Sequence, residues 1–244
     1  MTKLTSVVSL VKMRSRSLAN PIKDLSFARH KITFLSGPRQ CGKTTFARML
    51  LAERKIGVYH NWDQMAFRKT WATAPSAIIP PSKRGVVPLV VLDEIHKDRY
   101  WKRNLKGVFD TLERPCDFLV TGSAKLNVYM KGGDSLFGRH LSFRLHPFSI
   151  REMRRSDTLS PDTAIDAIFG RSEHKPKHVE RDLASLLEYG PFPEPLFGQN
   201  MRETRLWRRS REKLVIREDL RDISHLPDLG RIELLTSLLP QRIA

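Results

Sequence analysis

Cysteine is scarce in this chain, since only Cys41 and Cys116 occur among its 244 residues. Small secreted domains usually depend on several paired cysteines, so a disulfide framework is excluded. Long apolar runs are also missing: none approaches the ~20 residues that a membrane-spanning helix needs, and no secretory leader pattern opens the chain. We therefore expect a globular protein of a reducing compartment, the cytoplasm, with no membrane partner. The alternative is an organellar transit peptide in the first 23 residues, which are basic and lack acids.

Acidic residues are few relative to basic ones. The chain has 43 lysines and arginines against 26 acidic residues, which gives a formal charge of +17. A charge of this sign and size attracts polyanions over long distances and makes their binding strongly dependent on salt. No nucleic-acid-binding motif accompanies it, so two interpretations stay open: a surface that binds nucleic acid, and a basic surface that is only solvated.

The most informative stretch is residues 32–50, ITFLSGPRQCGKTTFARML. It begins as an apolar run typical of a β-strand, turns sharply, and continues as a helix former. Gly37, Gly42, Lys43 and Thr44 complete the pattern G-x-x-x-x-G-K-[ST] of a phosphate-binding loop, and we call residues 37–44 the phosphate loop. The alternative is a glycine-rich turn with a chance lysine, but the strand before the pattern and the helix after it favour the phosphate loop.

The positions of this loop have distinct chemical tasks. Backbone N–H groups of the loop and of the first helical turn converge on the α- and β-phosphates of a nucleotide, where the helix dipole also favours negative charge. We expect Lys43 to reach the β- and γ-phosphates and the Thr44 hydroxyl to bind Mg²⁺. The residues expected to form the phosphate site are Gly37, Pro38, Arg39, Gln40, Cys41, Gly42, Lys43, Thr44 and Thr45.

A second decisive stretch, residues 86–94, is an apolar run that ends in Asp93 and Glu94. Such a run is typical of a parallel strand buried on both faces, and ligands of open α/β sheets bind at the carboxyl ends of the strands. Asp93 would hold Mg²⁺ through its water shell, and Glu94 would orient and deprotonate the water that attacks the γ-phosphate. The alternative is that the two acids are a helix N-cap pair. Their position about 50 residues after Lys43, following a plausible crossover connection between parallel strands, favours the catalytic role instead.

A third apolar run, residues 118–120, is followed by Thr121, Gly122 and Ser123. A polar side chain at that edge of the sheet would lie beside the phosphate site, so Ser123 is our candidate for sensing the γ-phosphate. The alternative is a simple strand cap. Because the chain has no N-K-x-D motif for guanine, we take the nucleotide to be ATP.

Periodicity and turn residues predict the remaining elements. We expect a three-layer α/β P-loop NTPase fold with a mostly parallel sheet, followed by a partial helical lid domain. A basic N-terminal segment covers residues 1–27, the ATPase core covers 28–149, and a truncated helical region covers 150–244. The expected strands are 32–35, 58–61, 86–94, 118–120 and 141–145, and the expected helices are 44–55, ended by Gly57, then 62–71 and 100–113; residues 74–85 are expected to be an irregular loop.

The chain resembles a known family in an ordered set of motifs: GPRQCGKTT (37–45), VVLDEIH (90–96), LVTGSA (119–124), SLFGR (135–139), LHPFSIREM (145–153), EYGPFPEPL (188–196) and REDLRDI (217–223). The family is the AAA-type P-loop ATPases of bacteria and archaea that carry a C-terminal domain of unknown function. The resemblance implies that Arg139 lies near a nucleotide, in its own site or in that of a neighbouring copy in a homo-oligomer. From the residues alone, a basic residue before a strand usually pairs with a carboxylate. The family continues beyond the point where this chain stops, so the chain resembles a truncated member.

These observations predict an ATP-binding protein that hydrolyses ATP with Mg²⁺ and couples nucleotide state to conformational change. The alternative is a nucleotide-regulated module that binds nucleic acid or protein and hydrolyses little. Arginines between residues 202 and 217 could supply its basic face, or they could be a solvated helix surface. A small-molecule kinase is disfavoured because Glu94 stands beside Asp93.

Overall fold

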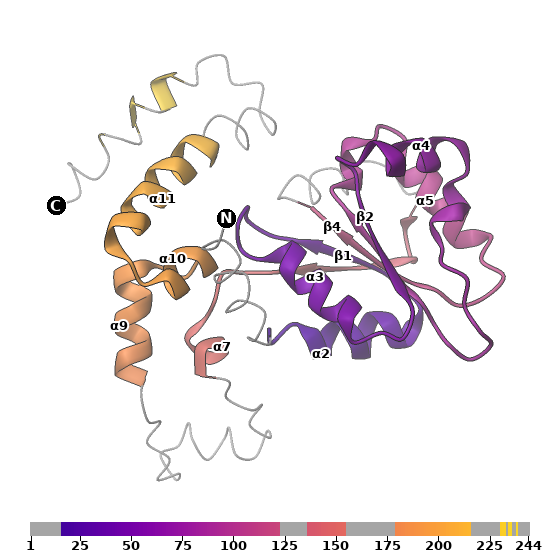
Figure 1. Ribbon diagram of the computed structural model, residues 1–244, viewed down its shortest axis with the longest axis horizontal. Coiled ribbons are helices and arrows are strands. Elements are labelled where there is room, and N and C mark those ends of the chain that lie inside the picture. Colours follow the sequence, from indigo (N-terminus) through magenta and orange to yellow (C-terminus); the bar gives the residue numbers. More distant parts are fainter. Residues whose placement is uncertain are drawn as a thin grey trace, which may run out of the picture.

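The described residues of the computed structural model are 16–122, 136–154, 179–215, 230–232, 234–235 and 238 (Figure 1). Their centre is a five-stranded sheet in which every neighbouring pair is parallel, in the order β2-β3-β4-β1-β5. The strands are β1 (Ile32–Ser36), β2 (Gly57–Asn61), β3 (Leu89–Asp93), β4 (Asp117–Thr121) and β5 (His140–Arg144). The predicted parallel sheet is confirmed, and each expected strand is present within a few residues of its expected place.

The three central strands are apolar along their whole length because both faces of the sheet are covered. Every residue of β1, β3 and β4 is buried, whereas the edge strands β2 and β5 are half-exposed. Alternate residues enter different cores, so that Phe34 packs with one cluster and its neighbour Leu35 with the other. This arrangement is the predicted three-layer α/β fold.

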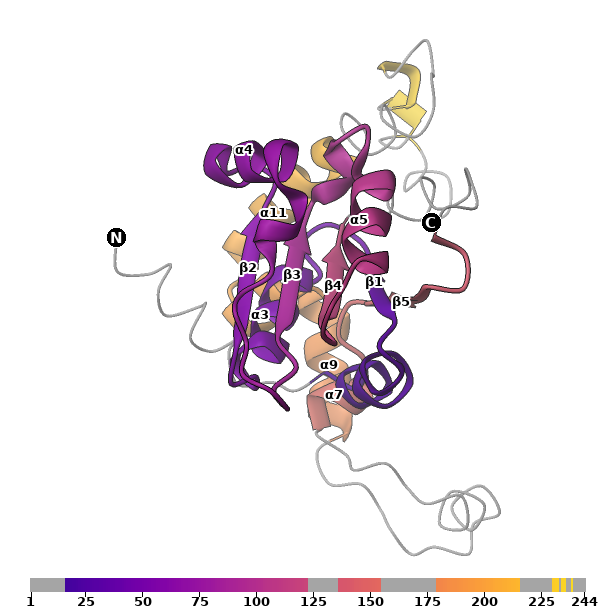
Figure 2. The same cartoon turned by 90° about the vertical axis from the view of Figure 1, so that its right-hand side faces the viewer.

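Each face of the sheet has its own group of helices, as Figure 2 shows. One face carries α4 (Met65–Thr73), the short turn η3 (Pro75–Ile78) and α5 (Trp101–Asp110), which contribute Trp71 and Leu105 to the first core. The other face carries α2 (Ala19–Pro21), η1 (Ile22–Ser26), η2 (Phe27–Arg29) and α3 (Lys43–Ala52). The turn η3 corrects the expectation that residues 74–85 hold no regular structure, since a single 3₁₀ turn fits where a proline occupies its first position.

The role expected for Gly57 is wrong. Helix α3 ends at Ala52 with Glu53 as its C-cap, and Gly57 is instead the first residue of β2. A Cβ atom there would lie 2.4 Å from the Leu51 Cδ1 atom and 2.8 Å from the Leu89 carbonyl oxygen. Glycine therefore permits the close approach of helix and sheet rather than ending the helix.

The described part of the C-terminal region is helical. It contains α7 (Ile150–Arg154), α9 (Val179–Tyr189), α10 (Pro193–Gly198) and α11 (Met201–Leu214), which Figure 1 shows grouped away from α4 and α5. Helix α10 contacts both α9 and α11. Asn200 caps α11 because its side-chain oxygen accepts hydrogen bonds from the N–H groups of Arg202 and Glu203. Within the described parts of the chain, every helix is too short or too polar to span a lipid bilayer.

Candidate nucleotide site

The phosphate loop joins the carboxyl end of β1 to the first turn of α3, as its motif predicted. Gly37 has a φ of 157°, and a Cβ atom at this position would lie 2.3 Å from the Leu145 carbonyl oxygen. Gly42, the N-cap of α3, has a φ of 95°, in the left-handed region. Both glycines of the motif are thus required by the backbone, the first by crowding and the second by its dihedral angle.

Lys43 is nearly buried, with 8% of its surface exposed. Its ammonium donates hydrogen bonds to the carbonyl oxygens of Gly37, at 3.0 Å, and Pro38, at 2.8 Å. Burial lowers the pKa of this ammonium. The structure therefore holds a partly desolvated cation against the start of the phosphate loop.

Asp93 lies at the carboxyl end of β3 and is almost fully buried. Its Oδ2 atom accepts hydrogen bonds from the Thr44 hydroxyl, at 2.9 Å, and from the Tyr59 hydroxyl, at 2.5 Å. Its Oδ1 atom accepts one from the Thr121 hydroxyl. The two residues expected at the metal are therefore in direct contact, and hydroxyl groups from β2 and β4 fix the carboxylate between them.

Sequence reasoning missed Tyr59 and Thr121, although a signal for Thr121 existed. In the parallel register Asp93 stands opposite Thr121 on β4, so a polar residue ending the next strand was placed to meet it. Tyr59 lies two residues before the end of β2, whose last residue stands opposite Asp93. Only its long side chain brings its hydroxyl to the carboxylate, which the sequence pattern does not indicate.

Glu94 follows Asp93 with left-handed backbone angles, φ 59° and ψ 21°. Its N–H donates to the Thr121 carbonyl oxygen at 2.9 Å, and its Oε2 atom lies 3.6 Å from the His96 Nε2 atom. Such a conformation costs free energy for a residue with a Cβ, and strained residues of this kind cluster at functional sites. Burial raises the pKa of Glu94, and the neighbouring charge of Asp93 raises it further.

Arg139 lies at the amino end of β5, where its carbonyl oxygen accepts a hydrogen bond from the Ile32 N–H. Its guanidinium pairs with Asp110 through both carboxylate oxygens, at 2.6 and 3.1 Å. A strand of this length spans about 16 Å, so Arg139 is at the opposite edge of the sheet from the phosphate loop of its own chain. A role in the site of a second copy stays a prediction. Ser123 lies outside the described residues, and its role also stays a prediction.

Two arginines that sequence reasoning missed donate hydrogen bonds to backbone carbonyl oxygens of the phosphate loop. The buried Arg16 donates from Nη1 to the Cys41 carbonyl oxygen at 3.1 Å, and from Nε to Glu152 at 2.9 Å. Arg211 of α11 donates from Nη1 to the Arg39 carbonyl oxygen at 2.7 Å. No motif marks either arginine, because each contact depends on how distant segments pack.

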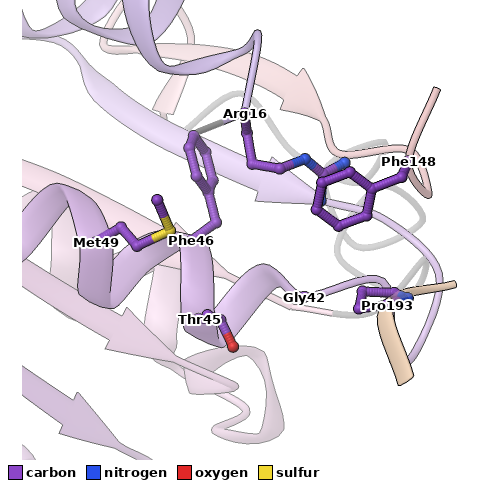
Figure 3. A pocket seen from close by; sticks show the side chains of 7 residues that line it. All are labelled: Arg16, Gly42, Thr45, Phe46, Met49, Phe148 and Pro193. Carbon is purple, nitrogen blue, oxygen red and sulfur yellow. The ribbon is translucent and has the colours of Figure 1, made fainter. Parts of the chain in front are cut away.

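A small cavity lies beside the first two turns of α3 (Figure 3). Thr45 and Met49, one helical turn apart, line it together with Phe148. The Arg16 guanidinium carbon lies 4.1 Å from the centre of the Phe148 ring. The complete lining is Arg16, Gly42, Thr45, Phe46, Met49, Phe148 and Pro193.

Comparison with known proteins supplies a family. Residues 29–154, more than half of the chain, match the family described as AAA domain. No curated protein matches the chain.

Three solved structures resemble the chain weakly. The Walker-type ATPase of Pyrococcus abyssi is 15% identical, over 94% of this chain and 77% of that one, with a TM-score of 0.47. PCH-2 of C. elegans is 14% identical, over 78% and 59%, with a TM-score of 0.39. The ORC1 protein of Aeropyrum pernix, in complex with DNA, is 17% identical, over 91% and 69%, with a TM-score of 0.37.

Proposed function

The chain belongs to the AAA domain family of P-loop ATPases, and from this premise we propose that it binds ATP with Mg²⁺ and hydrolyses it at the carboxyl ends of β1 and β3. The observation that carries the proposal is the 2.9 Å hydrogen bond between the Thr44 hydroxyl and Asp93. It brings the end of the phosphate loop and the acid of β3, which lie 49 residues apart, into one site.

Phosphate binding would draw on the backbone and on Lys43. The N–H groups at the start of α3 are without helical acceptors and provide donors for an anion. The Lys43 ammonium donates to two carbonyl oxygens of the loop, and phosphate oxygens would be stronger acceptors for it. The lysine would therefore exchange these carbonyls for the β- and γ-phosphates.

Thr44 and Asp93 have the oxygen donors that Mg²⁺ prefers, and the ion would offset negative charge on the phosphates. Within the described ranges, no group of three or more His, Cys, Asp and Glu side chains could hold a metal by itself. This fits Mg²⁺, which usually takes one or two protein ligands and fills its shell with water and phosphate. The hydroxyl groups of Tyr59 and Thr121 would keep the carboxylate of Asp93 in place.

Glu94 would act as the general base. It is half-buried beside Asp93, and its raised pKa makes its carboxylate a better proton acceptor than an ordinary glutamate. It would orient a water against the γ-phosphate and accept the proton of that water. ADP, phosphate and a proton are the products.

The base of the nucleotide would lie against the open side of the cavity beside α3, since the cavity itself has room for little more than a water molecule. Its apolar lining, with Met49 and Phe148, suits a flat heterocycle. Among the residues that line it, none has a carboxylate or amide side chain to recognise the N1–H and amino group of guanine. The three donor nitrogens of Arg16 are also engaged, by Glu152, Cys41 and His146. These features favour ATP over GTP.

The proposal includes three parts of the chain: a basic N-terminal segment of residues 1–27, an ATPase core of residues 28–149, and a helical region of residues 150–244 that would act as a lid.

A second candidate function is a nucleotide-regulated module that binds nucleic acid. Exposed arginines of α11, among them Arg205 and Arg209, favour it, as does the formal charge of +17. Both functions require the nucleotide site.

Binding of ATP to the Lys43→Ala variant tests that site. The substitution removes charge-assisted bonds to two phosphates, so the Kd for ATP should rise about 100-fold. Isothermal titration calorimetry measures it, with Lys55→Ala as the matched control, because Lys55 is exposed and lies beyond the end of α3. Equal affinity in the parent and Lys43→Ala would show that the phosphate loop has been wrongly assigned.

A further inference from the structure

The phosphate loop is contacted through its backbone carbonyl oxygens by two arginines that belong to distant parts of the chain. Arg16 precedes the core and donates to the Cys41 carbonyl oxygen at 3.1 Å. Arg211 belongs to α11 and donates to the Arg39 carbonyl oxygen at 2.7 Å. The two acceptors are alternate carbonyls of one short loop.

Each of these bonds fixes the direction of a peptide plane. In a trans peptide the C=O and the following N–H point in opposite directions. A carbonyl that is held toward an arginine therefore turns the next N–H away from that arginine. The N–H groups concerned are those of Gln40, after Arg39, and Gly42, after Cys41.

The backbone at these two positions needs such support. Gln40 has a φ of 62° and Gly42 a φ of 95°, so both lie in the left-handed region. This region is unfavourable for a residue with a Cβ such as Gln40, and a loop that contains it is stable only when its surroundings determine it. The arginine contacts are part of those surroundings.

We propose that Arg16 and Arg211 are positioning residues that hold the Gln40 and Gly42 N–H groups toward the phosphates of the bound nucleotide. The inference rests on the proposed function, since it requires that a nucleotide binds in this loop. Neither arginine touches the phosphates. Each acts through a backbone carbonyl on the far side of the loop.

Arg211 also makes α11 part of the nucleotide site. Its guanidinium carbon lies 3.9 Å from the centre of the Phe192 ring, and the Phe192 and Trp207 ring centres are 5.2 Å apart. Phe192 packs against the core cluster that contains Cys41, and Pro193 of α10 lies beside Gly42. Helices α10 and α11 are therefore docked on the phosphate loop through aromatic packing and one directed hydrogen bond.

Docking and nucleotide binding should strengthen each other. If contact with Arg211 favours the loop conformation that binds phosphate, then bound phosphate must favour contact with Arg211 by the same free energy. Nucleotide state would thus be passed to α11, and with it to the exposed basic surface of that helix. The hydrogen bond between Arg211 and the Arg39 carbonyl oxygen would therefore carry the expected coupling between nucleotide state and conformation.

The test compares Arg211→Met with Arg208→Met. Methionine keeps an apolar stem to pack on the rings but removes the donors. Arg208 is a matched control because it is on the same helix and also donates to a backbone carbonyl at 2.7 Å, that of Glu188 in α9 rather than one in the phosphate loop. Calorimetry should show a roughly tenfold rise in Kd for both ADP and ATP in Arg211→Met, and less than a twofold change in Arg208→Met.

A further variant and a second measurement separate positioning from mere packing. Arg211→Lys, which keeps a charged donor, should recover part of the affinity that Arg211→Met loses. Hydrogen exchange of α11 should slow when ADP is added to the parent and to Arg208→Met, but not when it is added to Arg211→Met. If Arg211→Met only loosened the fold, its melting temperature without nucleotide would be lower than that of the parent, and Arg211→Lys would not recover the affinity.

The outcomes distinguish this inference from the function on which it rests. If the parent binds neither ADP nor ATP, the proposed function fails and the inference falls with it. If the parent binds nucleotide and Arg211→Met binds it equally well, the inference alone is wrong. Equal losses in Arg208→Met and Arg211→Met would also overturn it, because the effect would then come from any α11 contact.

Discussion

Gly37 illustrates how one residue type determines the shape of the site. Its backbone passes so close to the residue that follows β5 that an added Cβ would lie 2.3 Å from the Leu145 carbonyl oxygen and 3.2 Å from the Cys41 sulfur. The nearer contact is backbone, which cannot rotate away as a flexible side chain could. The loop or the strand would have to move.

Gly37→Ala should therefore lower the free energy of unfolding by about 1–3 kcal/mol, as overpacking of a core typically does. Gly107→Ala is the matched control. Gly107 lies inside α5 with nothing within 4 Å of an added Cβ, so alanine should stabilise that helix by about 0.5–1 kcal/mol. Urea unfolding of both variants measures the difference, and a Gly37→Ala variant as stable as the parent would contradict the packing described here.

Among single residues, the sequence identified those that belong to a local pattern. Lys43 and Thr44 were found because the spacing of the phosphate loop is itself the signal, and Asp93 because an acid ended a buried strand. Arg16 and Arg211 were not found, because their acceptors are backbone carbonyls 25 and 172 residues away and a carbonyl is present at every position. Only the packing of the N-terminal segment and of α11 selects these particular oxygens.

Among the elements, the N-terminal segment and α7 are joined by a buried ion pair. The Arg16 Nε atom lies 2.9 Å from Glu152, and both side chains are less than 10% exposed, at 4% and 7%. Burial by itself would raise the pKa of Glu152, but hydrogen bonds and charge attraction from Arg16 outweigh it and hold the pKa below its ordinary value near 4.5. An acid with a lowered folded-state pKa stabilises the fold above its unfolded pKa, and this stabilisation is lost as the pH falls through the folded value.

Glu152→Gln should accordingly cost about 2 kcal/mol of unfolding free energy at pH 7, because it leaves the Arg16 charge buried without a counterion. Below pH 4.5 the cost should shrink, because Glu152 takes up a proton in the unfolded parent there, whereas in the folded parent it does so only at lower pH. Urea unfolding at pH 7 and pH 3.5 measures both values. The control is Glu53→Gln, whose exposed pair with Lys23 should contribute less than about 1 kcal/mol. A cost for Glu152→Gln that did not change with pH would contradict this account.

Helix α11 carries the charges on which the nucleic-acid alternative depends. Changing Arg205 and Arg209 to Glu should weaken single-stranded DNA binding at least tenfold if these side chains neutralise phosphates, and should lower the slope of log K against log salt. The control changes Arg68 and Lys69 of α4 to Glu, which alters the net charge equally in a part of the molecule distant from α11 (Figure 1). Equal effects of both pairs, or no retention of the parent on DNA at low salt, would reject a binding face on α11.

Elements were predicted best where the pattern was buried on both faces. The central strands are continuous apolar runs, so their existence followed from composition alone, and α5 has its apolar residues at helical spacing. The end of α3 was misplaced because Gly57 looks like a helix terminus in sequence but serves the close packing of Leu51 against β3. Such a requirement is a tertiary one and leaves no local signal.

The whole molecule assembles the site from segments that the strand order brings together. Because β4 lies between β3 and β1, Thr121 ends beside the strand from which the phosphate loop emerges, and Asp93 ends one strand further along the same edge. A parallel sheet places all these carboxyl ends on one edge, which is where its ligands bind. Arg139 lies at the amino ends of the strands, and is therefore at the opposite edge of the sheet from the phosphate loop.

The central claim is that this site hydrolyses ATP, and phosphate release from ATP by the parent and by Glu94→Gln tests it most directly. Glutamine can still hold a water but cannot accept its proton, so kcat should fall at least about 100-fold. The Kd for ATP should stay within about twofold of the parent value, since Glu94 is not expected to touch the phosphates. The account predicts Mg²⁺-dependent release by the parent and almost none by Glu94→Gln. Equal rates in the two proteins, or no release by the parent at saturating ATP and Mg²⁺, would contradict it.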